Sequence, residues 1–86
     1  MNSEYRYYNR RWCKVVDEID NRFIWLLYDM VTEGFYFRWG DNTDNLEEFK
    51  ISDNDVPEVV DNKFREYMVS PFYENDKRRG INGFDR

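Results

Sequence analysis

The residue types that perform acid–base and nucleophilic chemistry are scarce in this chain. It contains no histidine, the commonest general base and metal ligand, and only one cysteine, Cys13. Cys13 is followed by Lys14 but has no base nearby in the sequence to activate a thiol, so we interpret it as a small apolar residue. Carboxylates are abundant, but their spacing singles out no catalytic pair. We therefore expect a protein that is not an enzyme, with no catalytic residues, no cofactor and no metal site.

Acidic residues are concentrated in the middle of the chain. Between residues 41 and 61 there are eight of them against Lys50 alone, in a chain whose formal net charge is −5. Carboxylates arrayed on short helices can imitate the charge of a nucleic-acid backbone and fill a basic groove. We expect this segment to bind a partner through Asp41, Asp44, Glu47, Glu48, Asp53, Asp55, Glu58 and Asp61. The alternative is a solvated face that only keeps the protein in solution.

The composition suggests a source for such a protein. Ala, His and Gln are absent, whereas Asn, Asp, Tyr and Phe are abundant, which fits an AT-rich genome such as many phages carry. The chain is similar in composition to small acidic phage proteins that block nucleases or CRISPR effectors, although no motif identifies a family. We therefore hypothesise a viral inhibitor, anti-CRISPR-like and acting as a DNA mimic. Its partner would be a basic cleft on a host protein or ribonucleoprotein complex that handles nucleic acid.

Two basic clusters support a second hypothesis, a small nucleic-acid-contacting accessory module. The N-terminal segment interleaves arginines with aromatic rings, as platforms that stack nucleobases do, and the C-terminal segment holds three consecutive bases. The acidic middle of the chain argues against direct nucleic-acid binding, so this hypothesis ranks second. The residues that would contact the phosphates are Arg6, Arg10, Arg11, Lys77, Arg78 and Arg79.

Hydrophobic spacing predicts the elements that position these residues. Large apolar residues lie three or four positions apart from Tyr5 to Phe23, which predicts an amphipathic helix. The segment 23–31 is apolar on every side and Thr32-Glu33-Gly34 fits a hairpin loop, so segments 23–31 and 35–39 are predicted as paired strands. The alternative is an all-α fold with one long helix from residue 4 to about 32.

Helix signals return in the second half of the chain. Asp44 and Asp55 are each followed three residues later by Glu, which is the spacing of a helix N-terminus. This predicts one short helix over 44–50 and another from Asp55 to about Val69. Residues 74–86 are polar and contain glycine, so we expect a flexible polar tail after a single domain over 1–73. The predicted fold class is α+β, with an N-terminal amphipathic helix, a β-hairpin and two short helices.

The predicted hairpin is apolar on both sides, although a two-stranded sheet needs helices on only one of them. The uncovered face predicts a homodimer through the hairpin, and a structural homo-oligomer is the third functional hypothesis. The longest uninterrupted apolar run, Phe23 to Tyr28, has six residues, and the N-terminal residues lack a signal-peptide core. We therefore expect no contact with a membrane and a cytoplasmic protein, in the host cytoplasm if it is viral.

Overall fold

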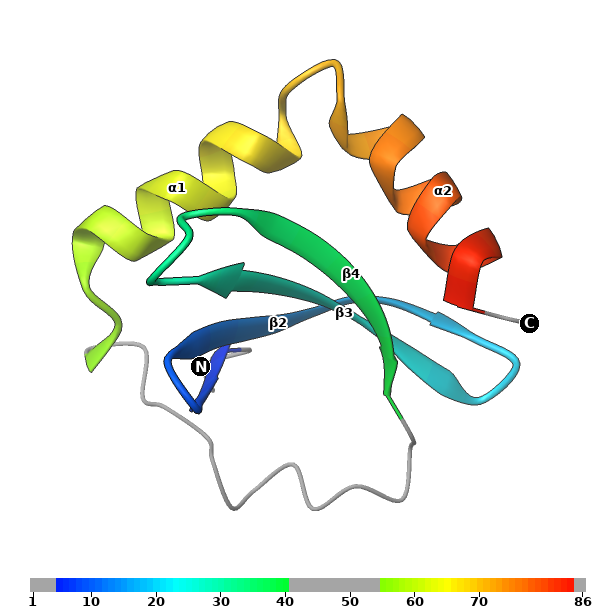
Figure 1. The fold of residues 1–86 in the computed structure, drawn as a ribbon, viewed down its shortest axis with the longest axis horizontal. Helices are drawn as coiled ribbons and strands as arrows, with labels where there is room; N and C mark the ends of the chain where they lie inside the picture. Colours follow the sequence, from blue (N-terminus) through cyan, green and yellow to red (C-terminus); the bar gives the residue numbers. More distant parts are fainter. Residues whose placement is uncertain (1–4, 41–54, 85–86) are drawn as a thin grey trace.

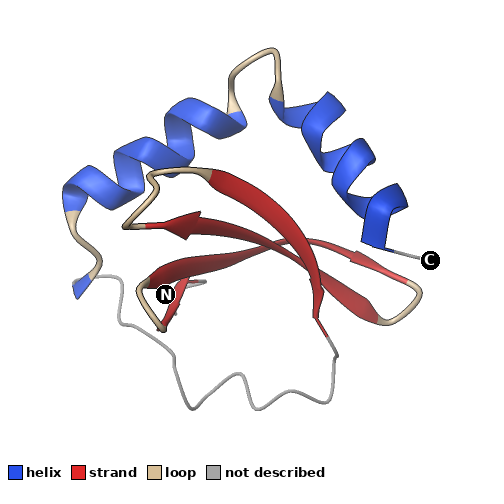
Figure 2. Ribbon diagram, viewed as in Figure 1, coloured by secondary structure: helices blue, strands red, loops and turns tan. Residues whose placement is uncertain are grey.

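The fold has two layers, an antiparallel sheet and two helices that lie across one of its faces (Figure 1). The computed structural model describes residues 5–40 and 55–84. Strands that are neighbours in the sheet are also consecutive in the chain, so the sheet is a meander. The strands are β1 (Tyr5–Tyr8), β2 (Arg11–Ile19), β3 (Arg22–Asp29) and β4 (Phe35–Gly40), and the helices are α1 (Glu58–Met68) and α2 (Tyr73–Phe84). Figure 2 shows both helices on the same side of the sheet.

The predicted N-terminal helix over 5–23 is wrong, and so is the alternative of one long helix. This stretch forms β1, β2 and the start of β3, with a two-residue turn at each reversal of the chain. Asn9 and Arg10 have φ values of 53° and 64°, and Asp20 and Asn21 have φ values of 52° and 62°. Two successive residues at positive φ form the turn whose twist matches that of paired strands, and Asn and Asp tolerate this conformation.

The helix-like spacing arises because turns and a bulge interrupt a period of two. Tyr5 and Trp12 both belong to the core between sheet and helices, but the first turn lies between them. In β2 the register with β3 shifts between Val15 and Asp17, so Val16 is an extra residue that also packs against this core. An alternation broken at these points gives spacings of three and four, as one side of a helix does.

The predicted pairing of segment 23–31 with segment 35–39 corresponds to β3 and β4, which form an antiparallel hairpin. The backbone N–H of Asp29 donates to the carbonyl oxygen of Gly34 at 3.0 Å. The carboxylate of Asp29 accepts two backbone N–H groups of the turn, at 2.8 and 3.2 Å. The residue at positive φ is Glu33, at 59°, and not the glycine. The sequence therefore located this turn but not its geometry.

Residues 55–84, the described part of the second half, hold one predicted helix and one that was not predicted. α1 begins after Pro57 and ends near the predicted Val69, but Asp55 does not cap it because the N-cap position is Pro57. The segment from residue 74, which we expected to be a tail, forms α2. The predicted helix over 44–50 lies outside the described residues. No helix in the described part of the chain is long and apolar enough to cross a membrane.

α2 is attached to the sheet along its length. The Nζ atom of Lys77 lies 2.9 Å from Oδ2 of Asp17 in β2, and Nε1 of Trp39 in β4 donates to the carbonyl oxygen of Ile81 at 3.2 Å. Gly80 allows the helix to approach β4, because a Cβ atom there would lie 2.9 Å from the Cβ of Phe37. The glycine that suggested a flexible tail is thus a point of close packing.

The core between the sheet and the helices is largely aromatic. Phe64 of α1 is fully buried, and its ring meets Tyr5 edge-on at a centroid distance of 5.1 Å and Phe35 edge-on at 5.3 Å. Phe35 also stacks on Tyr67 at 4.5 Å. Such ring pairs add to the free energy of apolar burial, which a chain of this length needs. These ring contacts hold α1 over the sheet, whereas α2 packs against β4 through the contacts described above.

Candidate interaction site

Among the described residues, the outer side of β4 is a free edge of the sheet. β3 pairs with β4 on one side, and no described strand pairs with it on the other. An edge strand exposes N–H and C=O groups on which another strand can form. Many proteins protect such edges with proline, lysine or a bulge. β4 has the sequence FYFRWG, so its only charged residue is Arg38.

The register shows which backbone groups of β4 point outward. Asp29 and Gly34 are a hydrogen-bonded pair, and the pairs of β3 with β4 continue from it without a shift. Hydrogen-bonded and non-hydrogen-bonded pairs alternate along an antiparallel ladder. The backbone N–H and C=O groups of Tyr36 and Arg38 therefore form hydrogen bonds with β3. The residues whose N–H and C=O groups point away from the sheet are Phe35, Phe37 and Trp39.

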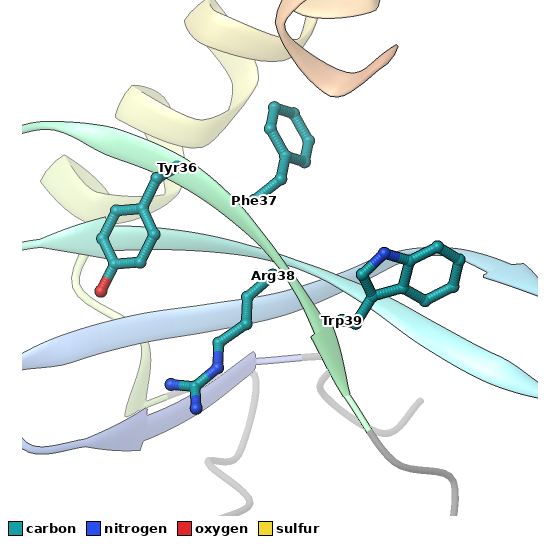
Figure 3. A pocket seen from close by; sticks show the side chains of 4 residues that line it. All are labelled: Tyr36, Phe37, Arg38 and Trp39. Atoms are coloured by element: carbon teal, nitrogen blue, oxygen red, sulfur yellow. The ribbon is translucent and has the colours of Figure 1, made fainter. Parts of the chain in front are cut away.

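Side chains along β4 alternate between the two faces of the sheet (Figure 3). Phe37 points toward the helices and is 3% exposed. Tyr36 and Arg38 project from the opposite face, and Tyr36 is 37% exposed. Together with Trp39 these side chains line a depression of about 300 Å³. The edge is therefore hollowed where a further strand would lie.

A second depression, of about 250 Å³, lies on the helix side of β4. Its lining combines aromatic side chains of β4 with Tyr67, Asp76, Arg79 and Gly80. The Tyr67 hydroxyl donates to Oδ2 of Asp76 at 2.8 Å, and Arg79 Nη2 lies 3.9 Å from Oδ1 of Asp76. Burial, together with this hydrogen bond to Asp76, raises the pKa of Tyr67, so its hydroxyl remains a donor at neutral pH. The remaining lining residues are Phe35, Tyr36, Phe37 and Gly80.

On the face opposite the helices, Arg38 shares its surroundings with Cys13 and Arg11. Burial raises the pKa of the Cys13 thiol to about 11, although the charges of Arg11 and Arg38 act in the opposite direction. The thiol is therefore protonated at neutral pH. Arg11 is balanced by Asp29, whose Oδ2 lies 3.6 Å from Arg11 Nε. Arg38 is exposed and forms no ion pair with any residue that the structure describes.

The acidic residues predicted to bind a partner are only partly described. Asp55 and Glu58 are exposed near the start of α1. Asp61 accepts a hydrogen bond from the Tyr5 hydroxyl at 3.0 Å and pairs with Arg65 at 2.7 Å, so it already has partners within the domain. The other five predicted acidic residues lie outside the described residues: Asp41, Asp44, Glu47, Glu48 and Asp53. The hypothesis that the acidic residues fill a basic cleft, here called the acidic-decoy hypothesis, stays a prediction.

The basic residues predicted to contact nucleic acid are divided between the two layers of the fold. Arg6 and Arg11 lie on the face of the sheet opposite the helices, because their positions alternate with those of the core residues. Arg10 occupies the turn between β1 and β2. On α2, Lys77 pairs with Asp17, Arg79 lies near Asp76, and Arg78 is exposed. The two clusters do not share one element, and nucleic-acid binding stays a prediction.

The described chain offers no candidate metal site, and comparisons add no relatives. Within residues 5–40 and 55–84, no three side chains of His, Cys, Asp or Glu are grouped so that they could hold a metal ion. No protein-family model, curated protein or solved structure matches the chain.

Sequence reasoning did not identify the β4 edge. It predicted a strand over 35–39 but placed a helix before the hairpin, so the hairpin had no sheet to extend. The missed signal was the pair of two-residue turns at Asn9-Arg10 and Asp20-Asn21. Recognising them would have predicted a meander, in which the last strand has a free side unless the chain returns to it.

Proposed function

We propose that this protein is a non-enzymatic binding domain that captures an extended segment of another protein as a fifth strand beside β4. The observation that carries this proposal is the edge of β4, which pairs with no further strand among the described residues and borders two depressions, one lined by β4 alone and one between β4 and α2. The proposal keeps the interaction class predicted from the sequence. It moves the contact from the acidic segment to a surface that the structure describes.

The chemistry of strand addition fits this edge. Backbone hydrogen bonds to an exposed strand supply affinity for any extended peptide, and depressions that receive alternate side chains supply selectivity. Phe35, Phe37 and Trp39 provide the outward backbone groups. Successive side chains of a captured strand would point to opposite faces of the sheet, alternately toward the depression beside α2 and toward the side of Tyr36 and Arg38.

A single strand fits beside β4 better than a second copy of the whole domain. Two-fold pairing of β4 with its own copy would place both α2 helices on the same face, across strands about 4.8 Å apart. Packed helices need about 8–10 Å between their axes. Since α2 meets β4 directly at Gly80 and Phe37, the two helices would interfere.

Residue-resolved amide hydrogen exchange tests strand capture. The probe is a capped, uncharged peptide of about eight residues that alternates Thr and Val, a length typical of strands. We expect the peptide to slow exchange at Phe35, Phe37 and Trp39. Exchange at Tyr36 and Arg38 should stay unchanged, because their amides already bond to β3.

N-methylated versions of the probe peptide are the matched control. Methylation of the amides that face β4 should abolish the protection, whereas methylation of the alternate amides should preserve it. Protection that has no period of two along β4, or that appears on α1 instead, would contradict strand capture. Absence of protection at any peptide concentration tested would also contradict it.

A further inference from the structure

We infer that the segment captured by β4 is acidic, with apolar and carboxylate side chains alternating along it. This inference rests on the proposed strand capture and specifies the partner's chemistry. It follows from what borders the edge on each side: α2 and the aromatic rings of the core on the face of Phe37, and on the face of Tyr36 an exposed arginine without a partner among the described residues.

The helix side selects an apolar residue. A partner residue paired with Phe37 would direct its side chain to the same face as Phe37, since paired residues share a face. The depression between β4 and α2 borders that face, and Asp76 there accepts a hydrogen bond from Tyr67 and lies 3.9 Å from Arg79. An apolar side chain would contact the rings there. A carboxylate would lose hydration beside these rings and would meet the Asp76 carboxylate, which lies 3.9 Å from Arg79.

The opposite face selects a carboxylate. Partner residues on either side of the apolar one would point to the face of Tyr36 and Arg38. Arg38 is exposed, lines the depression at the edge and forms no ion pair within the described chain. Arg11 lies on the same face but is balanced by Asp29. Arg38 is therefore the charge that an incoming strand would meet, and a guanidinium binds a carboxylate through two parallel hydrogen bonds.

The net charge of −5 acts against an acidic partner only at long range. At about 0.15 M salt the Debye length is about 8 Å, so distant carboxylates are largely screened while a directly opposed pair is not. Binding should therefore be measured at this ionic strength. Lower salt would strengthen both the local attraction and the overall repulsion.

The experiment compares three capped peptides of equal length that alternate Val with Glu, Val with Lys, or Val with Thr. We expect the Glu peptide to bind about three- to tenfold more tightly than the Lys peptide, because opposite charges across a strand pair attract and like charges repel. The Thr peptide should lie between them. Affinity can be followed by the amide signals of Phe37 and Trp39, which report occupation of the edge directly.

Three variants test the role of Arg38. Arg38→Glu should reverse the order of the Glu and Lys peptides, and Arg38→Gln should bring their affinities together while retaining a neutral side chain suited to the fold. Arg78→Glu is the matched control, because it changes the net charge equally from an exposed position on α2 that lines neither depression. It should leave the order unchanged.

The outcomes separate this inference from the proposed function. If all three peptides protect the β4 amides with equal affinity, strand capture stands and acidic selectivity is refuted. If Arg78→Glu changes the order as much as Arg38→Glu does, the preference reflects net charge and the inference is also refuted. If no peptide protects β4, strand capture itself fails. A stable dimer by light scattering that excludes every peptide would assign the edge to a second copy of the chain and overturn both proposals.

Discussion

Replacement of Phe64 by alanine tests whether the aromatic core holds the two layers together. The ring is fully buried and meets Tyr5, Tyr28 and Phe35 at centroid distances of 5.1, 6.4 and 5.3 Å. Truncation of a buried Phe to Ala costs about 3–5 kcal/mol. A domain of this length has about 4–13 kcal/mol of stability in total. We therefore expect Phe64→Ala to lose about a quarter or more of the free energy of unfolding.

Urea unfolding followed by circular dichroism measures this loss, because the midpoint falls in proportion to stability when the slope is unchanged. Phe64→Leu retains apolar volume but removes the ring contacts, so it should cost less than the alanine variant. Val59→Ala is the control on the same helix, at a side chain 62% exposed, and should change stability by about 0.5 kcal/mol or less. A loss below about 1 kcal/mol for Phe64→Ala would refute the proposed role of this ring.

Three further predictions concern α2 and the sheet. Gly80→Ala should lower the stability of the protein in urea unfolding. A Cβ atom 2.9 Å from that of Phe37 costs about 1–3 kcal/mol, whereas the gain in helix propensity is about 1 kcal/mol. A variant more stable than the wild type would show that α2 can shift freely. The hydrogen bond from Lys77 holds the pKa of Asp17 below its usual value, so its stabilising effect is complete above about pH 4 and disappears as the pH falls through the lowered value. Thermal midpoints of the wild type and Asp17→Asn should thus converge in acid, and a constant difference would contradict this. Cys13, with its pKa raised to about 11, should react with iodoacetamide near pH 8 about 100-fold more slowly in the native state than in urea, and equal rates would be incompatible with its burial.

The sequence predicted those elements whose signals are local and unbroken. The continuous apolar run 23–31, followed by Thr32-Glu33-Gly34 and a second apolar run, indicated two paired strands, and β3 and β4 are such a pair. The helix predicted from Asp55 to about Val69 corresponds to α1, which begins at Glu58, because its apolar stripe continues without interruption. In each case the residues that determine the element lie within one run of the chain, so spacing alone was informative.

The N-terminal half was mispredicted because spacing there depends on tertiary pairing. The positive φ values of Asn9 and Arg10 are required by the pairing of β1 with β2, and Arg is an unusual residue at such a position. The bulge at Val16 likewise exists only relative to β3. The prediction of a tail failed for a similar reason, since Gly80 weakens an isolated helix but permits contact with Phe37. In both cases the conformation depends on the strand or helix against which the segment packs, so the local sequence alone could not predict it.

The candidate site was hidden from the sequence because a free edge is a property of topology. None of the residues of β4 is unusual by type, and the groups that would bind are backbone N–H and C=O groups that every strand possesses. Their availability follows from the position of β4 at the end of the meander and from the alternation of hydrogen-bonded pairs. Charge counting, by contrast, drew attention to side chains between residues 41 and 61.

The acidic-decoy and strand-capture hypotheses differ in the physical origin of affinity. A decoy that opposes several carboxylates to a basic cleft should lose affinity steeply as salt rises, by about 10³-fold or more between 50 and 200 mM if six or more pairs form as on a nucleic acid. Strand capture depends on backbone hydrogen bonds, with Arg38 as the single charged residue of β4, so its salt dependence should be shallow. A steep dependence for an authentic partner would therefore argue for the carboxylates, and a shallow one that vanishes in Arg38→Gln would argue for β4.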